Sequence, residues 1–306
     1  MSKLSLFTLS STFLLNSISF SQDVPITLKD YNLFGSVKSH ITTTTVYGDK
    51  PEDNFTKKSS QSFNEPGFLI ESTYEMGHGV KGASFKFVYN EKNQIIEITD
   101  ITYDKPFVSL TNLYDASGYI TEQTKYNSDG KLDKHFTFIY NDKMEVVLKE
   151  LRTDPVKNPE KITAKYSYRY NAQSKVFEIV EDWINYKNTS KFSYNAKGKV
   201  SEEYYSTTKA DADDSETYSQ SKTYNEEGWL IGIIYKDKVG KILKQESFVY
   251  DHLERLTHHN QLNASGKVVG YTHYSEFDEI ADNWTKSATY DSKKMTSSEV
   301  RELTYY

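Results

Sequence analysis

Short runs in which aromatic and polar residues alternate recur along almost the whole chain. A spacing of two places the aromatic residues of each run on one face of a β-strand. The facing positions carry Lys, Thr, Ser and Arg but also Val and Ile, which indicates a second face that is partly solvated. No convincing amphipathic helix interrupts these runs. The clearest of them are Phe85-Phe87-Tyr89, Phe136-Phe138-Tyr140, Tyr166-Tyr168-Tyr170, Phe192-Tyr194 and Phe248-Tyr250.

A turn motif follows the runs: an aromatic residue, Asn or Asp, two variable residues, usually Gly, a variable residue and an aliphatic one. Asn or Asp accepts hydrogen bonds from backbone amides two residues on, and Gly supplies the positive φ that a type I turn with a G1 bulge requires. Where Gly is missing, as at Asn93, the substitute tolerates the left-handed conformation. The motif therefore predicts tandem β-hairpins. Clear copies begin at Tyr114, Tyr126, Tyr194 and Tyr224, and looser ones at Phe63, Tyr89, Tyr140, Tyr170, Tyr250, Leu262 and Phe277.

The spacing of the copies predicts the fold class. Successive copies start either 12–15 or 24–30 residues apart, which is one short period and its double. The expected fold is all-β, an elongated, curved antiparallel sheet of tandem β-hairpins in an open, solenoid-like array. Residues 22–306 form a single repeat domain in this interpretation, with polar loop insertions at 152–161 and 206–221. Because an open array exposes its edge strands, homodimerisation through an edge is expected.

These residues resemble the YD-repeat, or Rhs-type, family, whose repeats carry Tyr-Asp-x-x-Gly followed by an aliphatic residue. The resemblance covers residues 31–306 and is closest to small exported proteins of Bacteroidetes-type bacteria, which begin with a segment like 33–38 and end with one like 283–286. It implies a strip of hairpins. The larger members wind this strip into a hollow shell, for which roughly a dozen hairpins are too few. MORN-like repeats are a second and weaker resemblance.

Composition supports a thin structure covered by aromatic rings. The chain has 25 Tyr and 16 Phe but only 37% hydrophobic residues, and its mean hydropathy is −0.69. Few aliphatic residues with many amphipathic Tyr rings indicate that no thick aliphatic core exists. The net charge of −6 is spread in mixed signs without a basic stripe, so binding to nucleic acid has no electrostatic basis.

The first 21 residues predict export. Lys3 provides a positive start, residues 4–15 an apolar run, and Ser19 and Ser21 the small residues before a cleavage site, which together describe a signal peptide. The expected location is periplasmic, outer-surface or extracellular. No later stretch is long and apolar enough for a transmembrane helix. The absence of Cys excludes disulfides and thiolate metal sites.

The sequence contains no motif typical of catalysis. A G-x-S-x-G elbow, a Walker loop and an H-E-x-x-H helix are all missing, so the protein is expected not to be an enzyme and to hold no cofactor and no metal. His258 and His259 are adjacent, and adjacent residues of a strand point to opposite faces, so they cannot share a metal ion. The acidic stretch 211–216 lacks the Gly and the final acidic residue of a calcium-binding loop.

Three tryptophans, Trp183, Trp229 and Trp284, are the candidate binding residues, because exposed aromatic rings stack on sugars or anchor protein partners. Alternatively, they cap the aromatic rows. Three functions remain open: a non-catalytic secreted or cell-envelope interaction scaffold, a carbohydrate-binding or carbohydrate-processing protein, and an outer-membrane β-barrel. The expected partner is a protein or a glycan. Turns every 12–15 residues predict strands of about six residues, short of the ~9–11 that span a membrane.

Overall fold

The computed structural model describes residues 26–306 except 32, 34, 78–79, 103–104, 154–161, 210–217, 279, 282 and 292–293. The signal peptide expected at residues 1–21 lies outside the described residues. The elements are η1 (Leu28–Tyr31), β1 (Val37–Val46), η2 (Pro51–Asp53), β2 (Phe55–Phe63), β3 (Leu69–Met76), β4 (Val80–Lys81), β5 (Phe85–Tyr89), β6 (Ile95–Asp100), β7 (Phe107–Tyr114), β8 (Ile120–Tyr126), β9 (Leu132–Tyr140), β10 (Val146–Thr153), β11 (Ile162–Tyr170), β12 (Val176–Asp182), β13 (Tyr186–Tyr194), β14 (Val200–Lys209), β15 (Tyr218–Tyr224), β16 (Leu230–Asp237), β17 (Ile242–Tyr250), β18 (Leu256–Asn263), β19 (Val268–Phe277), β20 (Trp284–Asp291) and β21 (Lys294–Tyr305).

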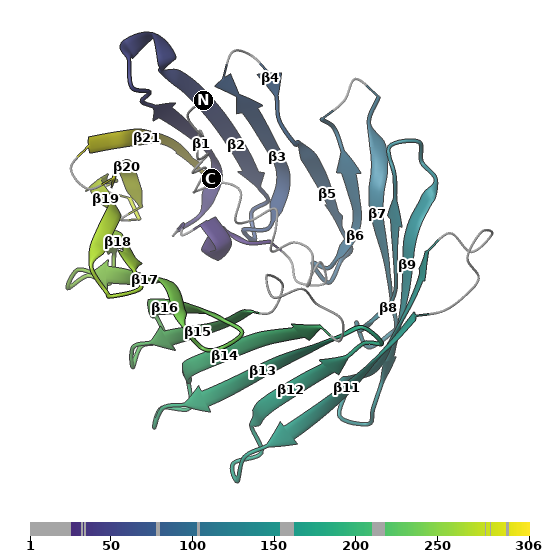
Figure 1. Ribbon diagram of the computed structural model, residues 1–306. Helices are drawn as coiled ribbons and strands as arrows, with labels where there is room; N and C mark the ends of the chain where they lie inside the picture. The colour runs from purple at the N-terminus through teal and green to yellow at the C-terminus, as the bar shows by residue number, and fades with distance from the viewer. Residues whose placement is uncertain are drawn as a thin grey trace, which may run out of the picture.

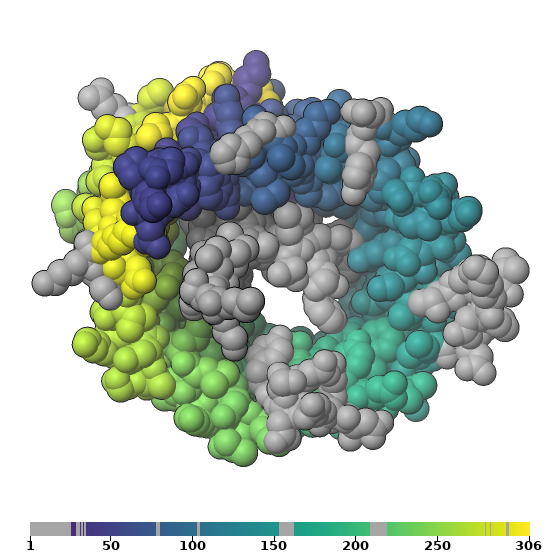
Figure 2. All heavy atoms as spheres, turned by 45° about the horizontal axis from the view of Figure 1, so that its top comes forward, coloured from purple at the N-terminus to yellow at the C-terminus, as the bar shows by residue number. Residues whose placement is uncertain are grey.

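The strands close into a barrel. Each pairs antiparallel with its neighbours in sequence, and β21 returns to pair with β1 from Val37↔Tyr305 to Val46↔Ser297 (Figure 1). β3 pairs directly with β5, and β4 is a short extension at the end of β3, so 20 of the described strands form the ring. The space-filling view shows this wall around a central opening (Figure 2).

The prediction of an open, solenoid-like array is therefore wrong, although the all-β class is right. Alternating rows and tight turns are the same in an open strip and in a closed one. Closure depends on many small bends that add up, and bulges bend and twist a strand. A register shift next to the motif tyrosine occurs in hairpin after hairpin, for example at Tyr89, Tyr114 and Tyr126. Because β1 and β21 pair with each other, the free edge on which the expected homodimer depended is absent from the ring.

The hairpin turns form as their chemistry predicts. In the turn after β8, the Asn127 side-chain oxygen accepts hydrogen bonds from the amides of Asp129 and Lys131, both at 3.0 Å. Gly118 has a φ of +93°, and Asn93 takes the same left-handed region where Gly is missing. Met144 and Glu254 also adopt it in their copies, so the turn imposes this conformation on residues that do not favour it.

The copies of the motif divide between the two ends of the barrel. Nine of them join β2–β3, β5–β6, β7–β8, β9–β10, β11–β12, β13–β14, β15–β16, β17–β18 and β19–β20, and so lie at one end, called here the tyrosine rim. Those starting at 126 and 262 join β8–β9 and β18–β19 at the opposite rim. A short interval therefore separates copies at opposite rims, and a doubled interval separates successive copies at the tyrosine rim.

Tyrosine hydroxyls connect neighbouring hairpins along the tyrosine rim. Strands of neighbouring hairpins stop pairing before they reach this rim. Between β8 and β9, for example, the last backbone pair is Glu122↔Thr137. Beyond that point Tyr140 donates to the carbonyl of Ile120 at 2.8 Å. The same bond recurs at 2.5–3.0 Å in seven places: Tyr89 to Leu69, Tyr114 to Ile95, Tyr140 to Ile120, Tyr168 to Val146, Tyr194 to Val176, Tyr250 to Leu230 and Tyr306 to Phe63.

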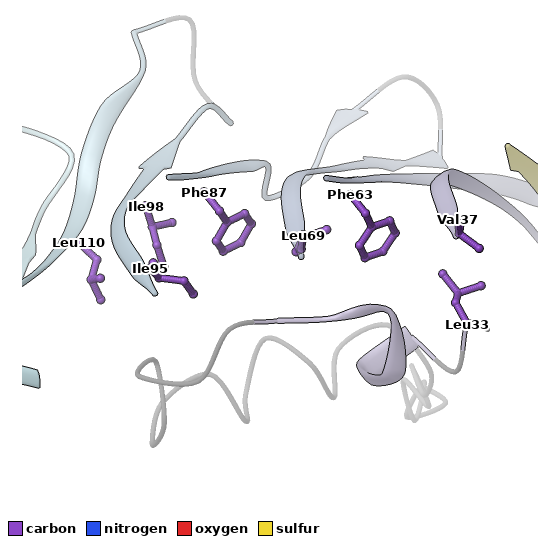
Figure 3. Packing of buried hydrophobic residues seen from close by; sticks show 8 residues of the cluster. All are labelled: Leu33, Val37, Phe63, Leu69, Phe87, Ile95, Ile98 and Leu110. Atoms are coloured by element: carbon purple, nitrogen blue, oxygen red, sulfur yellow. The ribbon is translucent and has the colours of Figure 1, made fainter. Parts of the chain in front are cut away.

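The N-terminal segment lies inside the ring and provides the main apolar core. Residues 26–33 hydrogen-bond to the β2–β3 hairpin, through Leu28 to Gly67 and through Leu69 to Ile26. Leu33 is buried against inward-pointing side chains of the wall (Figure 3). The cluster comprises Leu33, Val37, Phe63, Leu69, Phe87, Ile95, Ile98 and Leu110.

The two polar insertions lie mostly outside the described residues. Residues 206–209 belong to β14 and 218–221 to β15, so the second insertion is shorter than expected. Of the first, residues 152 and 153 complete β10. Within the described segments, no helix has the length and apolar character needed to cross a membrane.

Candidate functional site

The lumen of the barrel is the candidate functional site, because the aromatic rows face into it. Phe87 and Leu110 point toward the N-terminal segment inside the ring, and register extends this inward face from strand to strand (Figure 3). Val88 on β5 and Leu113 on β7 occupy the alternate positions of these strands; they are 43% and 57% exposed and point outward. A ring of 20 strands is wider than its own side chains can fill. The inward aromatic residues therefore line a cavity rather than close it.

A polar ladder crosses four neighbouring strands of this inward face. The Tyr166 hydroxyl of β11 donates to the Glu181 carboxylate of β12, which also accepts a bond of 2.9 Å from the Asn188 amide of β13. The Thr207 hydroxyl of β14 then donates to the Asn188 carbonyl oxygen at 2.9 Å. Burial raises the pKa of Tyr166, and the negative charge of Glu181 raises it further, so the phenol stays protonated and acts as a donor.

Two further inward carboxylates have cationic partners. Glu203 on β14 lies 3.3 Å from the Lys222 ammonium of β15. Glu246 on β17 lies 3.1 Å from Lys244 and 2.9 Å from His259 of β18. Burial by itself raises the pKa of Glu246, but hydrogen bonds from His259 and Lys244 outweigh it and leave the pKa below its usual range. Glu246 is therefore ionised and hydrogen-bonded at neutral pH, which suits solute binding better than proton transfer.

The wall across β8–β10 carries lysines instead of acids. Lys125 and Lys134 stand directly opposite each other on β8 and β9, and Lys149 stands opposite Phe138 on β10. The Lys149 ammonium lies 4.8 Å from the ring centre of Phe136 and 5.4 Å from that of Phe138. These three lysines are called here the lysine wall. It is a basic and aromatic surface within the lumen.

A shallow cavity of about 370 Å³ opens beside the lysine wall, between β10 and β11 near the tyrosine rim. Val147, the rings of Tyr166 and Tyr168, and the acidic residues Asp142 and Glu145 line it. Its mouth carries Lys143, whose ammonium lies 4.0 Å from the centre of the Tyr170 ring. Its volume falls in the ordinary range for small-molecule sites.

The structure does not bring the three tryptophans together. Trp183 follows β12 at the opposite rim, is 8% exposed and stacks on Tyr186 at 5.6 Å. Trp229 lies at the tyrosine rim, half-buried, and donates to Glu254 at 3.1 Å. Trp284 is 7% exposed, and the Arg301 guanidinium stacks on it at 3.5 Å.

These contacts favour the interpretation that the tryptophans are parts of the barrel wall rather than a shared binding surface. The lysine wall and the acids were missed in the sequence because their strands carry both signs of charge. Register alone shows which of these charges share a face.

The histidines take opposite faces as expected. His259 points inward and stacks on Phe248 at 4.5 Å, whereas His258 points outward and stacks on His273 at 4.7 Å. Burial, and then the neighbouring His273, lower the pKa of His258. In the part of the chain that the structure describes, no group of three or more His, Cys, Asp or Glu side chains is placed to hold a metal ion.

Fold and lumen together define a closed antiparallel β-barrel with an aromatic and charged interior. No family model matches the chain, and no curated protein matches its sequence. The resemblance to the YD-repeat family is therefore corrected: closure of the ring overturns the open strip that it implies. The turn motif is the part of that resemblance with a direct structural explanation.

Two porin-like proteins of known structure align with the chain. One, from Bacteroides uniformis, is 10% identical over 92% of this chain and 100% of its own, with a TM-score of 0.35. The other, from Bacteroides vulgatus, is 12% identical over 89% and 99%, also with a TM-score of 0.35. Agreement at this level carries no argument about function, and the assignment of a closed barrel rests on the strand pairing.

Proposed function

We propose that the protein is a non-catalytic, exported β-barrel of the cell envelope that acts through its lumen, where it binds a carbohydrate. The observation that carries the proposal is the pairing of β1 with β21, because closure turns the aromatic rows and hydrogen-bonded acids inward. Aromatic rings beside carboxylates, amides and hydroxyls suit the apolar faces and hydroxyl edges of sugars. The interpretation as an open interaction scaffold requires an open array of hairpins, which the pairing of β1 with β21 closes.

The outward face favours an aqueous surrounding for this barrel. Charged pairs cross it at mid-strand, such as Lys86 with Glu71 at 3.8 Å and Lys191 with Glu178 at 3.5 Å. A Lys at the midplane of a bilayer costs about 2–4 kcal/mol. Polar outward positions in mid-strand outnumber apolar ones such as Ile41, Leu148, Val180 and Ile234; they include Thr43, Ser60, Glu71, Lys86, Glu97, Thr124, Glu150, Ser167, Lys191, Ser206, Ser221, Ser247, Asn260 and Ser298.

Lumen binding is tested by blocking the lumen without changing the turns. Ser190 points inward from β13 opposite Tyr205, and Ser206 points outward from the neighbouring β14 opposite Thr189. The purified protein is screened on a glycan array, and the best saccharide is titrated by calorimetry. Ser190→Trp should abolish binding, whereas Ser206→Trp should leave it unchanged. Binding that survives Ser190→Trp would place the ligand elsewhere, and an array without any bound saccharide would overturn the carbohydrate assignment.

An outer-membrane pore is the second candidate, favoured by an even number of ring strands and a closed, edge-free sheet. It predicts that the exported protein stays in the membrane fraction, needs detergent for extraction and conducts ions in planar bilayers. The aqueous barrel predicts a protein that is soluble without detergent and gives no conductance. The two candidates share the lumen and differ in what surrounds the barrel.

A further inference from the structure

Strand register brings two histidines together on the outer face of the barrel. His258 on β18 and His273 on β19 are direct cross-strand partners and therefore lie on the same face. His258 also stands opposite Val249 of β17, whose side chain is exposed and points outward. The two imidazole rings stack with their centres 4.7 Å apart and their planes 22° apart. Because His273 is exposed and His258 is half-buried, solvent reaches the pair.

Hydrogen bonds fix the tautomer of His258. The Thr257 hydroxyl has one proton, which it donates to the carbonyl of Val249 at 3.1 Å. The same hydroxyl oxygen lies 3.2 Å from Nδ1 of His258, so it accepts a hydrogen bond from that nitrogen. Nδ1 therefore carries the proton of the neutral ring, and Nε2 keeps its lone pair. A metal-binding histidine is oriented in this way, by a hydrogen bond from the nitrogen that does not bind the metal.

The spacing of the two rings matches that of two imidazoles on one ion. A Zn²⁺ ion lies about 2.0–2.1 Å from a histidine nitrogen, and hence about 3.1 Å from the ring centre. Two rings that meet at the ion at about 90–110° then have their centres about 4.4–5.1 Å apart. The separation of 4.7 Å between His258 and His273 lies in this range. The rings turn about χ2 to point their nitrogens at the ion, and this torsion is broad in histidine.

The ligand atoms select the kind of ion. Neutral imidazole binds Cu²⁺, Ni²⁺ and Zn²⁺, whereas Mg²⁺ and Ca²⁺ prefer oxygen ligands. Burial, and then the neighbouring His273, lower the pKa of His258, so at pH 7 a metal does not compete with a proton for its Nε2.

We propose that His258 and His273 form a surface site for one divalent transition-metal ion, and that Cu²⁺ binds there most tightly. Two side chains are fewer than the four ligands of a structural zinc site, so water fills the remaining positions. The site lies on the outer face of the wall, and it therefore stands whether or not the lumen binds a carbohydrate.

Calorimetric titration of the purified protein, prepared without a histidine tag, tests the site with Cu²⁺. His258→Gln and His273→Gln should each weaken Cu²⁺ binding by at least about tenfold, because one of the two nitrogen ligands is lost. The matched control is His252→Gln, since His252 is exposed in the turn between β17 and β18 and should not affect the site. Equal Cu²⁺ affinity in the parent protein and in both site variants would overturn the proposal, as would a protein that binds no Cu²⁺ or binds Ca²⁺ more tightly than Zn²⁺.

Two further measurements report on the ligands themselves. The electron paramagnetic resonance spectrum of bound Cu²⁺ should show coupling to two imidazole nitrogens, and to one in His273→Gln; identical spectra of the two proteins would overturn the shared site. Thr257→Val keeps the shape of the side chain but removes the hydroxyl that orients His258, and it should weaken Cu²⁺ binding by about tenfold. Unchanged affinity in Thr257→Val would overturn the argument from the tautomer. Thermal melts without metal show that each variant is folded, and added Cu²⁺ should raise the melting temperature of the parent protein more than that of His258→Gln.

Discussion

The tyrosine bonds between hairpins predict a stability effect that a single hydroxyl controls. Tyr140→Phe removes the hydroxyl that donates to the carbonyl of Ile120 at 2.8 Å and leaves the ring in place. Ile120 is 5% exposed, so its carbonyl has little access to water once the donor is gone. A lost hydrogen bond costs about 0.5–1.5 kcal/mol, and an unsatisfied buried carbonyl raises the cost to about 1–3 kcal/mol.

Urea unfolding followed by tryptophan fluorescence measures this effect. The midpoint should fall while the slope with denaturant stays constant, because the surface exposed on unfolding is unchanged. Tyr306→Phe should behave alike, since its hydroxyl donates to the carbonyl of Phe63 across the closure of the ring.

Tyr126→Phe is the matched control for these variants. Tyr126 starts a copy of the same motif, but that copy lies at the opposite rim, where the described residues offer its hydroxyl no partner. Its free energy of unfolding should change by less than about 0.5 kcal/mol. Equal effects of Tyr126→Phe and Tyr140→Phe would refute the division of the motif between two rims.

Three further predictions follow from single residues. Burial and the Arg301 guanidinium lower the pKa of His40 to about 3. The unfolded chain therefore binds the extra proton first, and stability is lost as pH falls below about 6.5, by about 2 kcal/mol at pH 5. A His40→Gln variant should lack this part of the acid dependence in unfolding titrations, and an unchanged pH slope would contradict it. Gly118→Ala should lower the free energy of unfolding by about 1 kcal/mol or more, because Gly118 has a φ of +93°. Gly232 has an ordinary strand conformation, so Gly232→Ala should be neutral or stabilising. Thermal melts that shift in the same direction for both variants would contradict the argument. Trp229→Phe should leave saccharide affinity unchanged in calorimetry, because the indole bonds Glu254 on the rim, and a tenfold loss would return Trp229 to the binding site.

The sequence predicts the local structure well because turn chemistry is local. Asn127 closes its turn through bonds that span two and four residues, and Gly118 takes a conformation that few other residues tolerate. Alternation by two likewise identifies the strands. None of these signals depends on which strands meet far along the chain, so they hold in an open array and in a barrel alike.

Closure was not predictable in the same way. The contact between β1 and β21 joins residues such as Thr44 and Glu299, which stand at 3.3 Å although 255 residues separate them. Nothing in either strand differs in kind from a solvent-exposed edge strand. Apart from β4, β5 and β6, the strands have seven to twelve residues and so exceed the length of about six that the turn spacing suggested.

The candidate site was hidden for a related reason. The motif fixes the residues of the turn, so copies resemble one another where they build the rim and differ where their strands face the lumen. At those inward positions β8–β10 carry Lys125, Lys134 and Lys149, whereas Glu203 and Glu246 stand beside Lys222 and Lys244. The motif does not specify these inward residues, and only the strand register shows which charges share the lumen face. The inward side chains therefore vary from strand to strand, while the repeated tyrosines join the hairpins of the wall that carries them.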